Sequence, residues 1–157
     1  MATTATREQV RVHIRWMIRS DLPAVLATED ASFREPWGDE DVLRQLRQRN
    51  CIGVVAEVGE RVIGHMVYEL YEDHIGVCRL AVDPDHRRRG VGRQLVAKLL
   101  GKLSTPRRPA CTLYVGERNM PALLFFRRLG FLADRVERAY YEDGDDAIVM
   151  TYRLAAY

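Results

Sequence analysis

The chain has 157 residues, of which 47% are hydrophobic and 29% charged, and its formal net charge is +2. This balance is typical of one globular domain, and it excludes a disordered, collagenous or membrane-spanning chain, since no apolar stretch approaches the roughly 20 residues that a bilayer requires. So weak a positive charge does not favour a nucleic-acid partner. The N-terminus, MATTATREQV, lacks the apolar segment of a secretory signal, so we expect a cytoplasmic protein without a membrane partner.

The hydrophobic pattern predicts a flexible polar N-terminus over residues 1–9 and one domain over 10–157. In chain order the expected elements are a strand over 10–16, helices over 20–28 and 39–46, strands over 52–58, 61–70 and 75–82, a helix over 91–103, a strand over 110–115, a helix over 119–130, and strands over 131–141 and 146–154. Early antiparallel strands and a late βαβ unit predict a mixed α/β fold, in which about four helices flank one mostly antiparallel sheet.

The three cysteines, Cys51, Cys78 and Cys111, lie in apolar runs and form no CxxC pair. Cysteine in such a setting usually behaves as a small buried hydrophobic residue. We therefore expect neither a disulfide framework nor a metal site.

The segment LAVDPDHRRRGVGRQL, residues 80–95, is the part of the chain that carries chemistry. A strand ends, Asp83-Pro84 turns the chain, and Gly90 and Gly92 precede an amphipathic helix. The N–H groups of a helix's first turn lack internal partners and, with the helix dipole, form a site suited to a pyrophosphate. Neighbouring arginines could contact further phosphate oxygens. On spacing alone, a solvated Arg-rich loop explains the same residues equally well.

Two common phosphate loops are excluded, because the chain has neither GxxxxGK(S/T) nor GxGxxG. The run Arg87-Arg-Arg-Gly90-Val-Gly92 instead matches (R/Q)-x-x-G-x-(G/A), which resembles the acetyl-CoA signature of the GNAT N-acetyltransferases. Together with ASFREPW, NMPALLFFRRLGF and RAYYEDGDDAIVM, it resembles the RimI-type protein N-terminal alanine acetyltransferases. The resemblance extends from about Val10 to Leu154 in the family's order.

The resemblance implies acetyl-CoA as co-substrate, no metal, and direct transfer in a ternary complex to a primary amine, most simply the α-amine of a protein N-terminus. The thioester would lie where two strands separate, near Val82 and Leu113, with a strand amide polarising its carbonyl. The residues implied in acetyl-CoA binding are Leu80, Ala81, Val82, Arg87, Arg88, Arg89, Gly90, Val91, Gly92, Arg93, Asn119 and Phe126. Asn119 is also a good helix N-cap.

The sequence departs from the family at the two positions expected to move protons. Tyr114 stands where the family has a glutamate base, and Phe126 where it has a tyrosine acid, so neither role carries over. Tyr114 could hold a water or donate to the leaving thiolate. His74 is a candidate because histidine is suited to base chemistry at neutral pH, but an exposed turn histidine explains it as well. Glu117 is a further candidate, or a solvated residue.

For the other polar residues we expect structural, assisting or substrate-side roles and not catalytic ones. His65 is expected to be packed or at an edge, and His86 could only assist binding. Tyr140, Tyr141 and the acidic turn Glu142–Asp146 resemble the family's substrate-side hairpin, where carboxylates could hold a cationic peptide or simply be solvated.

The missing acid and base favour an α-amine over a lysine as acceptor. At about pH 7.4, roughly a quarter of α-amines but about one lysine in 1,000 are neutral nucleophiles. A thiol leaving group also needs little acid assistance, and positioning supplies much of the remaining acceleration. Two alternatives stay open: a GNAT that acetylates a small amine, and a non-catalytic acyl-CoA-binding relative. The sequence does not predict an oligomeric state.

Overall fold

The structure, a computed structural model, describes residues 7–155. The helices are α1 (Leu22–Ser32), α2 (Asp39–Leu46), α3 (Val91–Leu100) and α4 (Met120–Arg128), with single 3-10 turns η1 (Arg19–Asp21) and η2 (Pro84–His86). The strands are β1 (His13–Trp16), β2 (Cys51–Val58), β3 (Arg61–Leu70), β4 (His74–Val82), β5 (Ala110–Gly116), β6 (Leu132–Glu137) and β7 (Ala147–Arg153).

The described chain divides into two compact units, and one domain over 10–157 stays a prediction. The first unit holds the described residues up to 68 together with 79–99. The second holds 69–78 together with the described residues from 100 onward. The boundary on β4 falls between Cys78 and Arg79.

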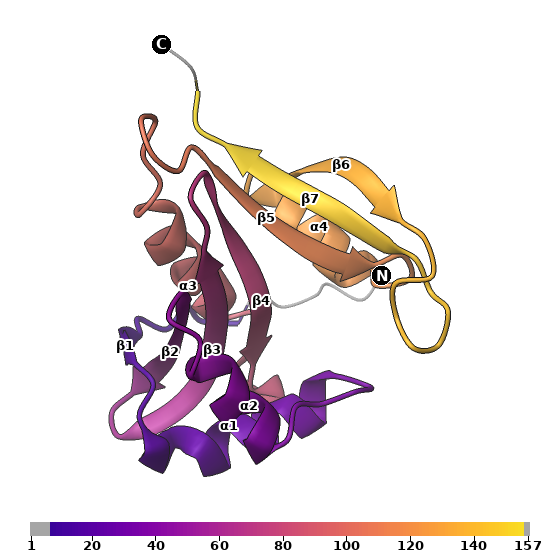
Figure 1. The fold of residues 1–157 in the computed structure, drawn as a ribbon. Helices are drawn as coiled ribbons and strands as arrows, with labels where there is room; N and C mark the ends of the chain where they lie inside the picture. The colour runs from indigo at the N-terminus through magenta and orange to yellow at the C-terminus, as the bar shows by residue number, and fades with distance from the viewer. Residues whose placement is uncertain (1–6, 156–157) are drawn as a thin grey trace, which may run out of the picture. The chain divides into compact units, whose positions relative to one another are not determined.

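The seven strands follow the order β1-β2-β3-β4-β5-β7-β6 (Figure 1). β4 and β5 run parallel, whereas β1 with β2, β5 with β7, and β7 with β6 run antiparallel. The expected mixed α/β fold with a mostly antiparallel sheet and four flanking helices is confirmed. None of the helices described is long and apolar enough to cross a membrane.

In the first unit, helices pack on the strands through side chains at helical spacing. Val25 of α1 and Val42 of α2 form a buried cluster with Val55 of β2, and each is at most 1% exposed. The amphipathic helix α3 buries Leu95 and Leu99 completely. Leu95 lies within van der Waals reach of Gly64 on β3, where a larger side chain would not fit easily. This packing fixes the N-terminus of α3 after the end of β4.

In the second unit, α4 packs on one side of β7 through aromatic rings. Phe126 meets Phe131 edge-on at 5.5 Å, and Phe131 lies 5.6 Å from Tyr152 of β7. Gly130, at φ +100°, ends the helix as expected. Because neighbouring residues of a strand face opposite sides, Val149 on β7 points away from α4.

The N-terminal strand is shorter than predicted. The chain over 10–12 bonds to α3 and its preceding loop instead of to β2: Val10 N donates to Arg89 O at 3.0 Å, and Val12 N donates to Gln94 Oε1 at 3.0 Å. Trp16, an apolar residue of the predicted strand, is not buried, since its side chain is 77% exposed. Of the predicted flexible N-terminus, residues 1–6 lie outside the described residues, whereas Arg7 donates to Asp85 O.

Other boundaries differ by a few residues. The first helix begins as η1 and runs to Ser32, the third ends at Leu100, and β6 ends at Glu137. Leu103 is still buried although it lies beyond the helix. β6 stops early because the chain turns at Ala139, which has a left-handed φ of +49°.

β4 contains one more residue than the part of β3 that it pairs with. Near the turn, Tyr71 N donates to His74 O at 2.9 Å, and at the far end Asp83 N donates to Ile63 O at 2.8 Å. Eight positions separate the β3 partners and nine separate the β4 partners. β4 therefore carries a β-bulge, a feature that re-aims side chains and is frequent beside active sites.

Candidate active site

The loop between β4 and α3, residues 83–93, is built by short-range contacts and will be called the phosphate loop. Asp83 caps η2, with Oδ1 accepting from Asp85 N at 3.4 Å and Oδ2 lying 2.9 Å from His86 Nδ1. Arg88 and Gly90 then adopt left-handed φ values of +63° and +80°. These two conformations turn the chain directly into α3.

The start of α3 offers hydrogen-bond donors to a ligand. Gly90 O accepts the first helical bond, from Gln94 N. Among the described residues no acceptor is recorded for the N–H groups of Val91, Gly92 and Arg93, as expected for a first helical turn. Nε of Arg89 is also buried without a partner in the described chain. Unsatisfied N–H groups at a helix N-terminus fit the pyrophosphate of acetyl-CoA.

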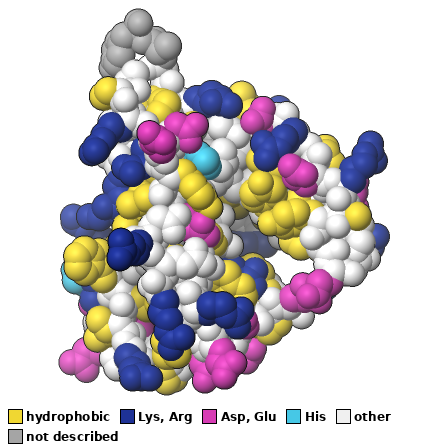
Figure 2. All heavy atoms as spheres, in the orientation of Figure 1, with side chains coloured by type: hydrophobic (Ala, Val, Ile, Leu, Met, Phe, Trp, Pro, Cys, Tyr) yellow, Lys and Arg dark blue, Asp and Glu magenta, His cyan; other side chains and the backbone are white. Residues whose placement is uncertain are grey.

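The arginines of the phosphate loop differ in their contacts and exposure. Arg87 folds back, with Nε donating to Val82 O at 3.1 Å and Nη2 to Ser32 Oγ at 3.0 Å, so its head ties the loop to α1. Arg88 and Arg93 are exposed. On the face shown in Figure 2, Lys and Arg side chains are interspersed with Asp and Glu side chains, in keeping with the small net charge.

Residues 7–12 lie along the phosphate loop and will be called the N-terminal strap. Besides the bonds from Val10 and Val12, Gln94 Nε2 donates to Val10 O at 2.6 Å. A Cβ on Gly90 would lie 2.2 Å from Gln9 Oε1. No local sequence pattern predicts the strap, because its contacts join residues about 80 positions apart.

β4 and β5 are paired over only part of their length. Their parallel register runs from His74 opposite Ala110 to Val77 opposite Leu113, yet β4 continues to Val82 and β5 to Gly116. Tyr114 is thus the first residue of β5 beyond the last pair, and Cys78 is the first of β4. The last β4–β5 pair contains the expected Leu113 but has Val77 in place of the expected Val82, which lies five residues farther along β4.

Tyr114 lies on the side of β5 that faces away from α4. Its ring is 39% exposed and stacks on Tyr140 at a centroid distance of 4.9 Å and an interplanar angle of 8°. Arg135 Nη2 donates to the Tyr114 hydroxyl oxygen at 3.3 Å. A hydroxyl group has one donor and two acceptor positions, so this contact leaves the O–H directed to another partner.

Glu69, near the end of β3, joins two side chains that no motif of the sequence connects. Cys78 Sγ donates to Glu69 Oε1 at 3.1 Å, and the Tyr71 hydroxyl donates to Glu69 Oε2. The Tyr71 ring lies over Gly76, where a Cβ would be 3.2 Å from it. The hydrogen bond to Glu69 raises the pKa of Tyr71 to about 12, so this phenol keeps its proton.

We call Tyr71, Tyr114, Tyr140, Glu69 and Cys78 the tyrosine face. The contact of Cys78 with Glu69 departs from the purely apolar setting expected for this cysteine. Cys111 fits that expectation, since it is fully buried and burial raises its pKa to about 12. Residue type alone gave no signal for Glu69, which belongs to no motif.

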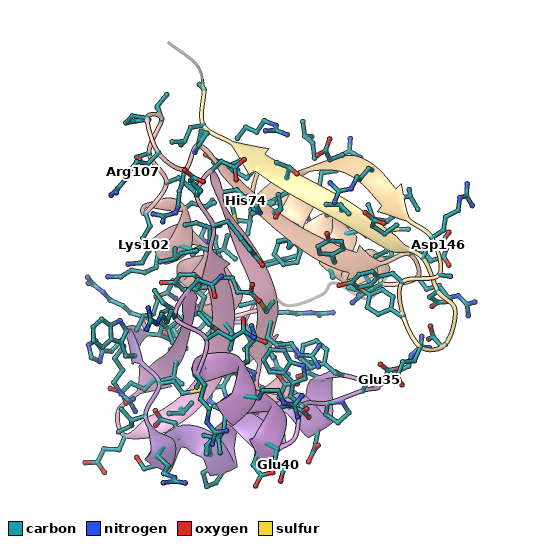
Figure 3. The ribbon with its side chains drawn as sticks, viewed as in Figure 1. Glu35, Glu40, His74, Lys102, Arg107 and Asp146 are labelled. Atoms are coloured by element: carbon teal, nitrogen blue, oxygen red, sulfur yellow. The ribbon has the colours of Figure 1, made fainter. Side chains whose placement is uncertain are left out.

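His74 lies at the beginning of β4 (Figure 3). Its ring stacks on Tyr71 at 4.6 Å, and Nδ1 lies 2.7 Å from Asp73 Oδ1. His74 pairs with Ala110, so Tyr114 is four residues farther along β5, about 13 Å at the rise of a strand. The two residues predicted to act in catalysis are therefore not brought together.

Two predicted cofactor residues lie in the second unit. Asn119 caps α4, with Oδ1 accepting from Ala122 N at 3.3 Å, which confirms the predicted helix N-cap. Phe126 is 8% exposed, in the aromatic core beside Phe125 and Phe131. Their contacts with a cofactor stay predictions.

The acidic turn before β7 uses most of its carboxylates internally. Asp145 is buried and pairs with Arg118 at 3.1 Å, and Asp146 Oδ1 accepts from Ala139 N at 2.8 Å. Glu117 Oε1 accepts from Asp146 N at 3.1 Å, so Glu117 clamps this turn. Figure 3 shows that Asp146 lies near the C-terminal end of β5, whereas His74 lies near the N-terminal end of that strand.

A buried polar cluster lies between β3, β4 and α1 in the first unit. His65 Nε2 lies 2.9 Å from Glu29 Oε1, and both side chains are at most 1% exposed, so His65 is packed as expected. The guanidinium of Arg79 lies between the rings of Phe33 and Trp37, at 4.2 and 4.7 Å. These contacts hold the connection between α1 and α2 against β4. None of the described His, Cys, Asp and Glu residues form a group that could hold a metal ion.

Comparison with known proteins adds a family and several relatives. Residues 22–131 match the model of the acetyltransferase (GNAT) family. The ribosomal protein bS18-alanine N-acetyltransferase of Salmonella typhimurium is 28% identical over 141 residues, covering 87% of this chain and 93% of the relative. The crystal structure of the ribosomal-protein-S18-alanine N-acetyltransferase from Escherichia coli matches with a TM-score of 0.82 and 25% identity, covering 94% of this chain and 96% of that one. The structure of Ard1 from Thermoplasma volcanium matches with a TM-score of 0.85 and 25% identity, covering 94% and 100%.

Proposed function

Because the chain belongs to the GNAT acetyltransferase family, we propose that it moves the acetyl group of acetyl-CoA to the α-amine of a protein N-terminus. The predicted family and enzyme class, an acetyl-CoA-dependent N-acetyltransferase, are confirmed. The acceptor class is supported by the relatives, whose names give an alanine of a ribosomal protein as the acceptor.

The observation that carries the proposal is the phosphate loop. Left-handed Arg88 and Gly90 turn the chain into α3, and the N–H groups of its first turn have no acceptor within residues 7–155. An anion at a helix N-terminus is stabilised by those N–H groups and by the helix dipole. We assign the pyrophosphate of acetyl-CoA to this loop.

Acetyl-CoA supplies the acetyl group in activated form, as a thioester. We assign its pantetheine arm to the main chain of β4 over 80–82, and further contacts to Asn119 and Phe126. Arg88, Arg89 and Arg93 are the loop arginines assigned to phosphate oxygens, whereas Arg87 acts through its bonds to Val82 and Ser32.

Tyr114 is the group we assign to the leaving side of the reaction. It stands where β5 parts from β4, and Arg135 occupies one acceptor position of its hydroxyl oxygen. The O–H can therefore donate to the thiolate as the carbon–sulfur bond breaks. The transfer is direct: the amine attacks while both reactants are bound, and positioning supplies much of the acceleration.

A peptide beginning with alanine and carrying one internal lysine tests the proposal. We expect acetyl-CoA-dependent acetylation mainly at the α-amine, read by mass spectrometry, because far more α-amine than lysine is neutral at pH about 7.4. The same peptide with a blocked N-terminus is the control. Acetylation mainly on lysine would overturn the acceptor class.

The same assay separates the two alternatives. Turnover of polyamines but not of peptides would indicate a small-amine enzyme, and CoA binding without turnover would indicate a non-catalytic relative. Direct transfer in a ternary complex, a cytoplasmic location and the lack of nucleic-acid, membrane and metal partners stay predictions.

A further inference from the structure

The chain lacks a glutamate at the family's position on β5, but the structure places another carboxylate beside the point where β4 and β5 separate. Glu69 contacts Cys78, the first residue of β4 beyond the last β4–β5 pair, through a 3.1 Å hydrogen bond. Tyr114, the first residue of β5 beyond that pair, belongs to the same unit. Glu69 comes from β3, outside every motif that the resemblance used.

We propose that Glu69 binds the α-ammonium group of the acceptor and takes up one of its protons. This inference rests on the proposed function and names the group that prepares its acceptor.

Two neighbouring side chains hold the Glu69 carboxylate in place. Tyr71 and Cys78 each donate to one of its oxygens. A carboxylate accepts hydrogen bonds from an ammonium group, and the opposite charges strengthen such a bond. Since the pKa of Tyr71 is raised to about 12, Tyr71 stays the donor and Glu69 the acceptor.

The remaining members of the tyrosine face suit a cation. Tyr114 and Tyr140 stack at 4.9 Å, and each is more than a third exposed. Aromatic faces attract ammonium groups, and an adjacent carboxylate adds a full negative charge. Two arginines contact this face: Arg135 is bonded to Glu137 at 3.1 Å and to the Tyr114 hydroxyl, so part of its charge is already compensated, and Nε of Arg108 donates to Tyr71 O.

The other candidate bases are less well placed. His74 is four residues before the separation point and bonds to Asp73, and Glu117 clamps the acidic turn. Glu69 alone among these three contacts a residue at the separation point.

The proton balance closes with Glu69 as acceptor. The α-ammonium gives one proton to Glu69, the neutral nitrogen attacks the thioester carbonyl carbon, and the carbon–sulfur electron pair leaves with sulfur. A second proton leaves nitrogen as the amide forms, and the thiolate takes one proton to become the CoA thiol. Glu69 returns its proton to solvent, so each turnover yields acetylated peptide, CoA and one proton.

Binding of the acceptor gives a test without turnover. Peptide affinity is measured by calorimetry on parent and Glu69→Gln, using an alanine-initial peptide and its N-acetylated form, with CoA present. The free-amine peptide should bind about 10-fold more weakly to Glu69→Gln, a loss of about 1.4 kcal/mol. The N-acetylated peptide, which has no charge at this end, should bind both proteins equally.

Turnover gives the second readout. At pH about 6.5 we expect kcat of Glu69→Gln to fall about 100-fold, the lower end of general-base effects, because most of the amine is then protonated. The deficit should shrink as the pH approaches about 9, where the α-amine is already neutral. Tyr71, Cys78, His74 and Arg108 are the ionisable or charged residues of the second unit that contact Glu69 or Tyr71, so His74→Ala and Cys78→Ala are run in parallel.

Controls separate this role from folding and from cofactor binding. Glu72→Gln removes an exposed carboxylate from the neighbouring turn and should behave as the parent. CoA affinity should be unchanged in Glu69→Gln. Tyr71→Phe, which keeps the carboxylate and removes one of its donors, should show the same pH-dependent deficit at about one-tenth the size, and it replaces Glu69→Gln if that variant does not fold.

The outcomes distinguish this inference from the proposed function. If the parent acetylates α-amines and Glu69→Gln matches it in peptide affinity and at every pH, Glu69 has no such role, although the function stands. If the parent acetylates only small amines or lysines, the proposed acceptor is wrong, and with it the binding of an α-ammonium by Glu69. Equal weakening of free and acetylated peptides would also overturn the inference, because it indicates a purely structural effect.

Discussion

The phosphate loop and the tyrosine face are built from different parts of the chain. The loop uses backbone groups, all within 83–93: two left-handed residues, and the N–H groups at the start of α3, which have no acceptor in the part of the chain that the structure describes. The tyrosine face uses side chains from β3, β4, β5 and the segment after β6, held together by hydrogen bonds and ring stacking. A backbone site depends on conformation and tolerates changes of side chain, whereas a side-chain site responds to the loss of a single hydroxyl or carboxylate.

The largest effect should come from changing the backbone of the loop. Gly90→Val places a β-branched residue at φ +80° and pushes against Gln9, so the α3 N–H groups can no longer adopt their arrangement. We expect CoA affinity to fall by more than about 100-fold, or about 2.7 kcal/mol, in calorimetry. Gly59→Val is the matched control, since Gly59 has φ +62° in a hairpin turn with open space around it. It should lower stability and leave CoA binding intact; equal binding by both variants would refute the loop assignment.

On the tyrosine face, the Tyr71–Glu69 bond should be visible in a pH titration. The pKa of Tyr71 is raised to about 12, and in Glu69→Gln it should return toward about 10, a hundredfold change in the acid dissociation constant. The phenol absorbance of parent minus Tyr71→Phe isolates this group. Because the folded pKa is raised, the stabilisation is complete below the unfolded pKa of about 10 and is lost as the pH rises through about 12. A Tyr71 titration unaffected by Glu69→Gln would contradict the hydrogen bond.

Removing one hydroxyl from the tyrosine face should reduce turnover but not cofactor binding. We expect Tyr114→Phe to lower kcat about 10-fold, below the usual range for a proton-transfer group because a thiolate leaves readily. Steady-state kinetics and CoA calorimetry measure the two effects. Tyr152→Phe, whose ring packs on Phe131, is the control and should do neither. A normal kcat in Tyr114→Phe would remove this hydroxyl from the reaction.

A side-chain change in the phosphate loop should have a small effect. Arg88→Ala removes one exposed guanidinium and should weaken CoA binding about 3-fold, with less dependence on salt than the parent. Arg88→Gly removes the same charge and suits the left-handed φ of +63°, so it separates charge from conformation. Arg107→Ala, in an exposed turn, is the control. A loss as large as that of Gly90→Val would mean that the loop binds through this side chain.

The smallest effect is expected at His74. Since it bonds to Asp73 and lies about 13 Å along the strand from the Tyr114 position, His74→Ala should change kcat/KM less than about 2-fold. The pH profile of the parent should follow the α-amine of the substrate. A limb near pH 6.5 that disappears in His74→Ala would instead make this histidine the base.

The sequence predicts the backbone site well and the side-chain site poorly. Local signals determine the loop: Asp83-Pro84, the two glycines, and the four-residue spacing of Val91, Leu95 and Leu99. Asn119 and Gly130 likewise mark the ends of α4 by their own chemistry. The N-terminal strap and the contacts of Glu69 depend on tertiary pairing, for which no local pattern exists.

The extra residue in β4 explains part of this failure. Strand alternation assigns Cys78 and Arg79 to opposite faces. In the structure Cys78 reaches Glu69 and Arg79 reaches Glu29, the partner of His65, and His65 and Glu69 lie an even number of residues apart on β3. A bulge places two consecutive side chains on one face, and sequence alternation does not reveal where it occurs.

Because of the same bulge, the alternation of side chains between the two faces of β4 restarts, and the strand has one phase of alternation before the bulge and another after it. Substitutions before it alter which side chains meet Glu69 and Tyr71, and substitutions after it alter those under the phosphate loop, without changing the phase of the other segment. A single-residue deletion at 78 or 79 would remove that independence by forcing both ends into one phase.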